Sequence, residues 1–266
     1  MDIKNNNGSK KAEMRIAVGV RFWGEKKEDI SVIENFLDNA LKTNVEKILV
    51  AINIDKDRTN AVEILIDEYP ENRVNTFGVT PWGKFVLPCN ALILKAAEEK
   101  ATHLLTASTE VTLTQDIIDQ LVSHMDNETL IVGAALPGHK LSESNQETTL
   151  VLDATGVEFP WGTYALWNLR YLQTTGICAI GDAPFDPTKA GVEEMVTLTI
   201  LQKKIFPGTK IKLVEIDGIQ WNTDFTGERL EKHIKKMESK AERPEAQFNF
   251  IGLKCRPTVI HIKKTS

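Results

Sequence analysis

Short apolar segments alternate with amphipathic helical segments through the first half of the chain, and this alternation limits the possible folds most. Residues 14–20 and 47–54 are β-rich apolar runs, which are typical of strands buried on both faces of a sheet. Between them, apolar residues recur at helical spacing over residues 33–41. A strand, a helix and a second strand of these lengths imply that the two strands pair in parallel.

The alternation continues to residue 136 and then stops. Further strands are predicted at residues 73–77, 103–107 and 130–135, and further helices at 61–68, 87–100 and after the capping residue Thr114. We therefore expect an α/β fold with a mostly parallel, twisted, Rossmann-like sheet flanked by helices, and a less regular second half. Such sheets bind ligands outside the carboxyl ends of their strands.

One domain is expected over residues 14–240, divided into a nucleotide-binding half at 14–136 and a second half at 137–240. Residues 1–13 are largely polar, and we predict a disordered tail, because this composition does not offset the entropy lost on ordering. Residues 241–266 are basic. The sequence leaves open whether they form a C-terminal arm or an added edge strand, and whether they join a second subunit in an oligomer.

The composition argues against several classes of protein. The net charge of −5 over 266 residues gives no basic face of the size that duplex nucleic acid requires. The three cysteines show no CxxC spacing, which argues against a disulfide framework and a zinc site and favours a reducing compartment. The polar start and the lack of an 18-residue apolar run predict neither a signal peptide nor a membrane span. We expect a cytoplasmic protein.

Four segments, in order along residues 15–240, share a recognisable pattern. They are KILVAINIDKDRTNAVEIL at 47–65, the turn Trp82-Gly83-Lys84 with the helix through Asn90, LLTASTEVTLTQDIIDQLV at 104–122, and Gly191-Val192-Glu193-Glu194-Met195. Together they resemble the inverting family-two glycosyltransferases, which have the GT-A fold. The resemblance covers nearly the whole chain.

The resemblance implies a donor site for a nucleotide-diphosphate sugar. The family has an aspartate after the second strand that holds the nucleotide base, and Asp55 or Asp57 matches it. Lys84 and Asn90 match the Gly-rich turn and the helix that follows it; Lys84 could pair with a phosphate as a point charge or be an ordinary surface lysine. Ser108 offers a hydroxyl to a ribose oxygen or a water molecule.

The metal motif departs from the family pattern. Ser108-Thr109-Glu110 stands where the family has Asp-x-Asp, which holds a divalent cation, Mn²⁺ or Mg²⁺, on the diphosphate. Glu110 is either the remaining carboxylate ligand or a surface glutamate. The family often completes the metal site with a histidine, and residues 219–224 contain none.

The acidic pair at residues 193–194 is similar to the family's catalytic pair. Inverting transfer needs a carboxylate that takes the proton of the acceptor hydroxyl, and the resemblance puts Glu194 in that position with Glu193 beside it. Acidic residues in a first helical turn are also favoured by the helix dipole without any catalysis. Trp161, in a Gly/Pro loop, is assigned to acceptor binding, because sugar rings stack on aromatic faces. Asp182 is assigned to acceptor binding as well.

These assignments predict an inverting hexosyltransferase that moves a sugar from a nucleotide-diphosphate sugar to a hydroxyl acceptor. The alternative is a catalytically degenerate protein of the same fold that binds a nucleotide-sugar or a glycan, which Ser108 and the missing histidine favour. A nucleotidyltransferase ranks last, because the segment after the first strand, residues 20–27, contains one glycine.

Overall fold

A nine-stranded sheet forms the centre of the computed structural model, which describes residues 13–23, 30–55, 65 and 68–264. The strands are β1 (Ile16–Phe22), β2 (Lys47–Asn53), β3 (Val74–Val79), β4 (His103–Ala107), β5 (Thr129–Ala134), β6 (Thr148–Val151), β7 (Tyr164–Asn168), β8 (Lys210–Val214) and β9 (Val259–Ile262). Their spatial order is β3-β2-β1-β4-β7-β5-β8-β9-β6. Nearly all of the expected tail, most of the expected helix at 61–68 and Asp57 lie outside the described residues.

Most neighbouring strands run parallel. β1 pairs in parallel with β2 and β4, β2 with β3, β5 with β8, and β8 with β9. β7 lies antiparallel between β4 and β5, and β6 lies antiparallel to β9. The predicted α/β class with a mostly parallel sheet is confirmed.

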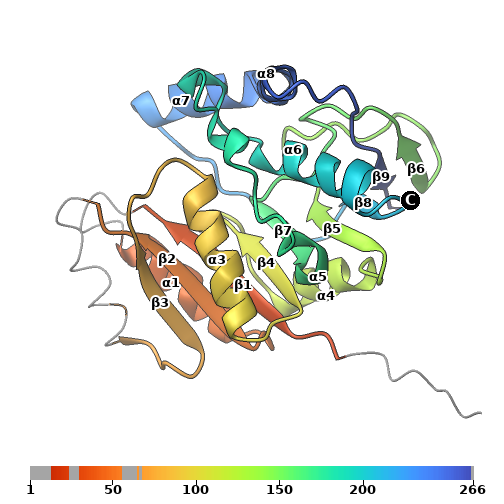
Figure 1. Cartoon of the computed structure of the whole chain (residues 1–266). Helices are drawn as coiled ribbons and strands as arrows, with labels where there is room; N and C mark the ends of the chain where they lie inside the picture. The colour runs from red at the N-terminus through yellow and green to blue at the C-terminus, as the bar shows by residue number, and fades with distance from the viewer. Residues whose placement is uncertain (1–12, 24–29, 56–64, 66–67, 265–266) are drawn as a thin grey trace, which may run out of the picture.

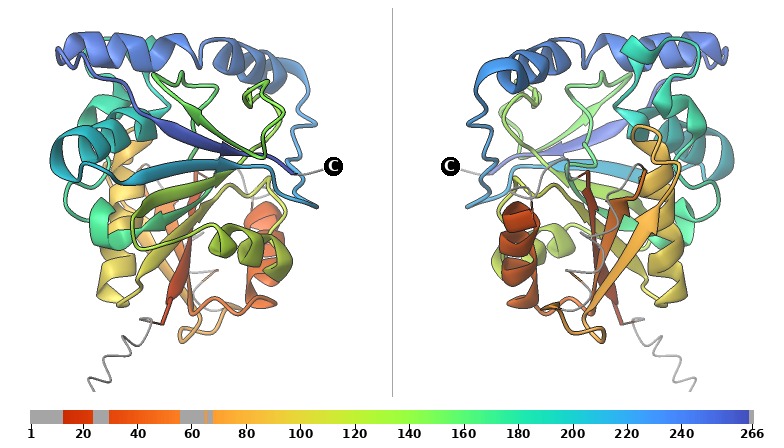
Figure 2. Two further views of the ribbon diagram at one scale, coloured as in Figure 1. Left: turned by 90° about the vertical axis from the view of Figure 1, so that its right-hand side faces the viewer. Right: turned by 90° about the vertical axis from the view of Figure 1, so that its left-hand side faces the viewer.

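Helices cover both faces of the sheet. They are α1 (Ile30–Leu41), α3 (Val86–Glu98), α4 (Gln115–Ser123), α5 (Leu169–Leu172), α6 (Glu193–Ile200), α7 (Gly227–Glu238) and α8 (Glu242–Phe250). Figure 2 shows α1 and α4 on one face, α3 and α6 on the other, and α7 with α8 crossing the top of the molecule. The top is the side on which the acidic pair of α6 lies.

Two apolar cores follow from this layering, one on each face of the sheet. β7 contributes to both, because its successive side chains point to opposite faces. Tyr164 and Leu166 join the core beneath α1 and α4, whereas Ala165 and Trp167 join the core beneath α3, α5 and α6. All five β7 residues are buried, so the strand is enclosed on both sides.

The last 26 residues contribute to the fold as well. Residues 241–266 supply α8 and then β9, which lies between β8 and β6. Among the described residues, no helix combines the length and the apolar character needed to cross a bilayer.

Candidate active site

The first turn of α6 brings the predicted acidic pair to the rim of the sheet. The chain enters α6 through Gly191, with a φ of +105°, and Val192, with a φ of +56°. A β-branched residue rarely adopts this left-handed conformation, and such strain gathers at functional sites. The turn places Glu193 and Glu194 at the start of the helix, where its dipole favours negative charge.

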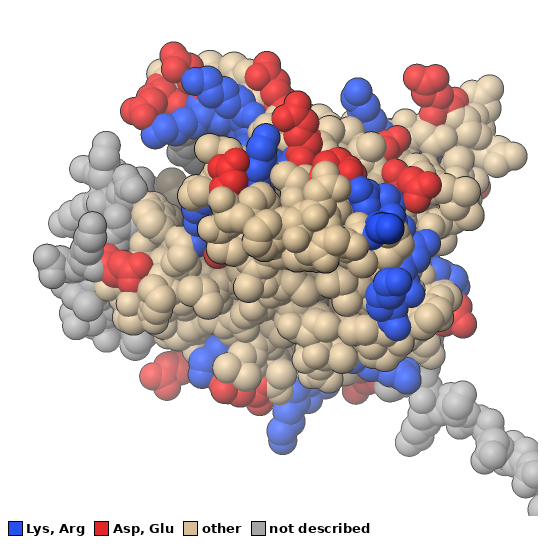
Figure 3. Space-filling model, turned by 45° about the horizontal axis from the view of Figure 1, so that its top comes forward, with Lys and Arg blue, Asp and Glu red and all other residues tan. Residues whose placement is uncertain are grey.

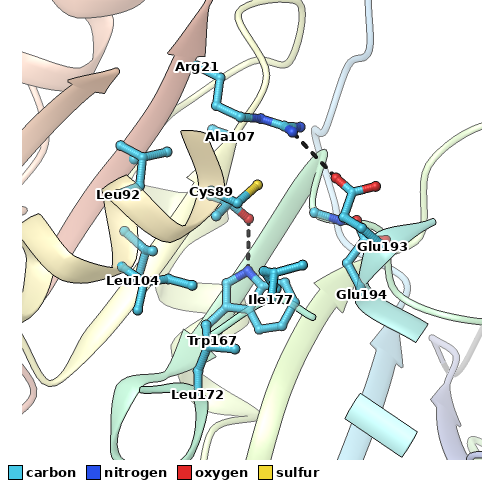
Figure 4. Close-up of a pocket in the computed structure, with 14 residues that line it drawn as sticks. Arg21, Cys89, Leu92, Leu104, Ala107, Trp167, Leu172, Ile177, Glu193 and Glu194 are labelled. Atoms are coloured by element: carbon cyan, nitrogen blue, oxygen red, sulfur yellow. Dashed lines mark hydrogen bonds and ion pairs between the residues drawn. The ribbon is translucent and has the colours of Figure 1, made fainter. Parts of the chain in front are cut away.

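Glu193 is buried and paired with an arginine from the first strand. Its side chain is 6% exposed, and its Oε1 lies 3.4 Å from Nη1 of Arg21. Nη1 of Arg21 also donates to the carbonyl oxygen of Phe85 at 3.4 Å. Figure 4 shows Arg21 reaching across the pocket to Glu193. The arginine compensates a charge that burial alone would make costly.

Glu194 is equally buried, at 5% exposure, but its two oxygens have different surroundings. Oε1 accepts the backbone N–H of Gly162, whereas Oε2 is buried without a hydrogen-bond partner among the described residues. Burial, and then the charge of Glu193, raise the pKa of Glu194 to about 7. A carboxylate with one oxygen that no hydrogen bond occupies and a near-neutral pKa has the properties of a general base.

A glycine is required at residue 162 to hold Glu194 in this way. A Cβ atom there would lie 2.7 Å from Oε1 of Glu194. The N–H of Ser108, just past the end of β4, donates to the carbonyl oxygen of the neighbouring Thr163 at 2.8 Å. The Gly162–Thr163 turn therefore joins the end of β4 to the start of α6.

A buried lysine and a buried tryptophan form the upper wall of the site. Lys240 follows α7 and is 6% exposed, and its Nζ lies 2.7 Å from the centroid of the Trp161 ring. Burial lowers the pKa of Lys240 well below its usual range. Trp161 stacks on His139 at a centroid distance of 3.5 Å, and its Nε1 donates to the carbonyl oxygen of Gly156 at 2.7 Å. The residue assigned to acceptor stacking therefore lies beneath Lys240.

A small cavity lies between these side chains, and a second one lies beneath the acidic pair. The first, about 40 Å³ in volume, is lined in part by Arg21, Trp161, Glu193, Glu194, Lys236 and Lys240. The second, about 20 Å³, is largely apolar and is the pocket drawn in Figure 4. Cys89 lines it, and burial raises the pKa of this thiol to about 12, so the thiol is a poor nucleophile at neutral pH.

The residues assigned to the donor hold the loops at the rim. Oδ1 of Asp55, after β2, accepts the Thr80 hydroxyl at 2.6 Å, and Oδ2 accepts the N–H of Trp82 at 2.9 Å. Nζ of Lys84 donates to the carbonyl oxygen of Pro187 at 2.8 Å. Asp55 and Lys84 thus shape the loop after β3, and their contacts with a nucleotide stay predictions.

Asn90 and Asp182 both connect α3 to the segment that precedes α6. The Asn90 amide exchanges two hydrogen bonds with the backbone of Ile177, at 3.0 and 2.7 Å. Oδ1 of Asp182 accepts the N–H groups of Phe85 and Val86, at 2.8 and 3.1 Å. Asp182 therefore caps α3 from a distant part of the chain, and its contact with an acceptor stays a prediction.

The Ser108-Thr109-Glu110 segment does not assemble a metal site. The Ser108 hydroxyl donates to Oε2 of Glu110, and the carbonyl oxygen of Glu110 accepts the N–H of Asn222 at 2.9 Å. In the part of the chain that the structure describes, no three His, Cys, Asp or Glu side chains are grouped for a metal ion. Trp221 lies edge-on to Trp161 with its ring centroid 6.1 Å away. This donor set does not fit the oxygen-rich shell of Mn²⁺ or Mg²⁺.

Three residues of the site were not found from the sequence. Arg21 carries a weak signal, as a single basic residue near the end of the first apolar run. Gly162 lies beside the predicted Trp161 but gave no sign of its contact with Glu194. Lys240 had no local signal, because a lysine at the end of a charged helix is typical of a solvated surface.

Comparisons with known proteins give distant likenesses only. No protein-family model and no curated protein matches the chain. Its structure is similar to mannosyltransferase PcManGT from Pyrobaculum calidifontis in complex with GDP-Man and Mn²⁺, with 16% identity, 62% of this chain and 48% of that chain covered, and a TM-score of 0.48. It is also similar to S. aureus TarS 1–349 in complex with UDP-GlcNAc, with 13% identity, 70% and 52% covered, and a TM-score of 0.47.

A third similar structure is GalNAc-T7 with UDP, GalNAc and Mn²⁺. The match has 10% identity and a TM-score of 0.49, and it covers 64% of this chain and 38% of the GalNAc-T7 chain. The match to the first two proteins spans about half of their length. At these identities and TM-scores, the likenesses do not establish a shared function.

Proposed function

We propose that the chain transfers a sugar from a nucleotide-diphosphate sugar to a hydroxyl acceptor, with inversion at the anomeric carbon. The observation that supports this most is the environment of Glu194. Its carboxylate is buried, one oxygen is fixed by Gly162, and the other oxygen has no hydrogen-bond partner in the described part of the chain. It lies near the end of β4, and a mostly parallel sheet binds ligands beyond the carboxyl ends of its strands. The resemblance of the four sequence segments points to the same reaction.

In the proposed step, Oε2 of Glu194 takes the proton of the acceptor hydroxyl while that oxygen attacks the anomeric carbon. The bond from the anomeric carbon to the diphosphate oxygen breaks on the opposite side, and its electron pair leaves with the nucleotide diphosphate. Glu193 keeps the pKa of Glu194 raised, and Arg21 balances the charge of Glu193. A base whose pKa lies near the working pH transfers protons most effectively.

The remaining assignments belong to the same proposal. Asp55 or Asp57 holds the nucleotide base, Lys84, Asn90 and Ser108 contact the rest of the donor, and Trp161 and Asp182 contact the acceptor. Glu110 is assigned to a divalent cation. The proposed mechanism does not use this cation, because the described residues do not group the ligands that it needs. We place the protein in the cytoplasm, which its three free cysteines favour.

A screen of nucleotide-sugars tests the proposal. The protein is incubated with UDP-sugars and GDP-sugars and a panel of alcohol and glycan acceptors, and released UDP or GDP is measured by chromatography. We expect release with at least one donor that depends on the acceptor, and a product with inverted anomeric configuration by NMR. Binding of a donor without release would instead support the degenerate binding protein, and neither binding nor release would overturn both assignments.

A further inference from the structure

Two lysines line the cavity above the acidic pair, and an arginine at the start of α8 lies near them. Lys236, near the end of α7, and Lys240, just beyond it, line this cavity together with Glu193 and Glu194. Arg243, at the start of α8, approaches the turn before α6, where its Nη1 lies 3.0 Å from the position of a Cβ on Gly191. Figure 3 shows blue and red side chains lying together at the top of the molecule, on the side of α7.

The three cations differ in burial: Lys240 is buried, Arg243 is half-buried and Lys236 is exposed. Within the described ranges, no acidic side chain forms an ion pair with Lys236, Lys240 or Arg243, although Arg21 is paired with Glu193. Among the described residues, Nε of Arg243 is buried without a hydrogen-bond partner. Charged groups out of water are costly unless an opposite charge or hydrogen bonds compensate them. Glu193 and Glu194 line one part of the cavity, whereas the part formed by Lys236 and Lys240, with Nε of Arg243 nearby, offers donors to an anion.

The backbone at Lys240 is held in place by a close contact with residue 156. A Cβ atom on Gly156 would lie 2.1 Å from the carbonyl oxygen of Lys240, so only glycine permits this approach. The Lys240 side chain then lies against the Trp161 ring, which Gly156 also binds through its carbonyl oxygen. The lysine is thus positioned by the fold, unlike a lysine on a mobile surface.

We propose that Lys236, Lys240 and Arg243 bind the diphosphate of the donor directly and supply the positive charge that a divalent cation provides at other sites. This rests on the proposed function, because it places the leaving group beside the base Glu194. Burial lowers the pKa of Lys240 to about 6, and a diphosphate beside it would favour the ammonium form. Ammonium and guanidinium groups form strong, charge-assisted hydrogen bonds to phosphate oxygens. As the glycosidic bond breaks, the same groups stabilise the charge that develops on the leaving diphosphate.

Calorimetry of the full chain with inorganic pyrophosphate, UDP and GDP, in EDTA and then with Mn²⁺, tests this site. We expect binding in EDTA that Mn²⁺ does not strengthen. Lys240→Met and Arg243→Met should each weaken pyrophosphate binding by about tenfold or more, since a hydrogen bond to a charged group contributes roughly 1.5–3 kcal/mol. Lys240→Arg should restore part of the affinity. Lys235→Met, an exposed lysine on the same helix, serves as the matched control and should change nothing.

Binding that requires Mn²⁺ would overturn the proposal, and so would binding that is equal in the wild type, Lys240→Met and Arg243→Met. A lack of any pyrophosphate, UDP or GDP binding would overturn it as well. Thermal melts of each variant show whether it is folded. Because pyrophosphate binding requires no sugar transfer, intact binding without any transfer would count against the proposed function and leave the anion site standing.

Discussion

The backbone N–H of Gly162 donates to Oε1 of Glu194 and ties the loop before β7 to the first turn of α6. The next residue, Thr163, accepts the N–H of Ser108 at 2.8 Å. Two consecutive residues thereby bring the Ser108-Thr109-Glu110 segment and the acidic pair to one side of the sheet. This is the arrangement that catalysis by Glu194 requires, and it could not be read from segments so far apart in the chain.

Replacing Glu194 with glutamine should stabilise the fold at high pH. Burial raises the pKa of Glu194 to about 7, so the folded form holds this proton more tightly than the unfolded chain, in which the ordinary value is 4.5. The stability from this group is present below pH 4.5 and is lost as the pH rises through about 7. Glu194→Gln stays neutral, and its amide oxygen can still accept the N–H of Gly162.

Thermal melts at pH 4.5 and pH 8 check this. Relative to the wild type, we expect Glu194→Gln to melt a few degrees higher at pH 8 and to show a smaller difference at pH 4.5. Glu71→Gln changes an exposed glutamate, and its melting temperature relative to the wild type should be the same at pH 4.5 and pH 8. A stability difference for Glu194→Gln that does not depend on pH would show that the carboxylate is not buried in the way described.

Glu193 should control the pH range in which Glu194 acts as a base. Its negative charge is one cause of the raised pKa of Glu194. Glu193→Gln removes that charge and leaves Arg21 unpaired, and both changes favour an ionised Glu194. The acidic limb of the pH profile of kcat should therefore move to lower pH in Glu193→Gln. An acidic limb at the wild-type position would exclude this coupling.

Asp182 should contribute to stability by capping α3. Asp182→Ala leaves the N–H groups of Phe85 and Val86 without their carboxylate, which should cost about 1–2 kcal/mol in urea unfolding. Asp182→Asn keeps an acceptor oxygen and should cost less. Asp119→Ala, on the exposed side of α4, is the control and should stay within about 0.5 kcal/mol. If Asp182→Ala costs no more than this control, the capping role is wrong.

Gly156→Ala should disturb both the fold and the anion site. Its Cβ would lie 2.1 Å from the carbonyl oxygen of Lys240, so the backbone around Lys240 must move. Overpacking of this kind typically costs about 1–3 kcal/mol, and we expect pyrophosphate binding to weaken at the same time. Urea unfolding and calorimetry measure the two effects. Unchanged affinity in a destabilised Gly156→Ala would mean that the position of Lys240 is unimportant for binding.

The sequence predicted the elements whose signals are local. Thr114 was expected to cap a helix, and its Oγ1 accepts the N–H of Ile117 at 3.4 Å at the start of α4. The first parallel strands were found because apolar runs alternate with helical segments. β7 was missed because it lies beyond residue 136, where the alternation of strands and helices stops, and because it runs directly into α5.

The candidate site also contains some residues with a local sequence signal and others without one. The acidic pair could be located from its sequence pattern, because both residues lie in one helical turn. Lys240 could not, since its burial depends on Trp161 and Gly156, which are distant in the chain and meet it only in the folded structure. A metal-binding Glu110 stays a prediction, because Ser108 offers a hydroxyl where the family has a carboxylate and no local pattern supplies a further ligand.

The rate of nucleotide diphosphate release by Glu194→Gln is the most direct test of Glu194 as the general base. With a donor and acceptor from the screen, at saturating donor and pH 8, we expect this variant to be slower than the wild type by about 100-fold or more, while its Kd for the nucleotide diphosphate is unchanged. The unpartnered oxygen would then be the base. Equal turnover by Glu194→Gln and the wild type would contradict the assignment of Glu194 and, with it, the proposed mechanism.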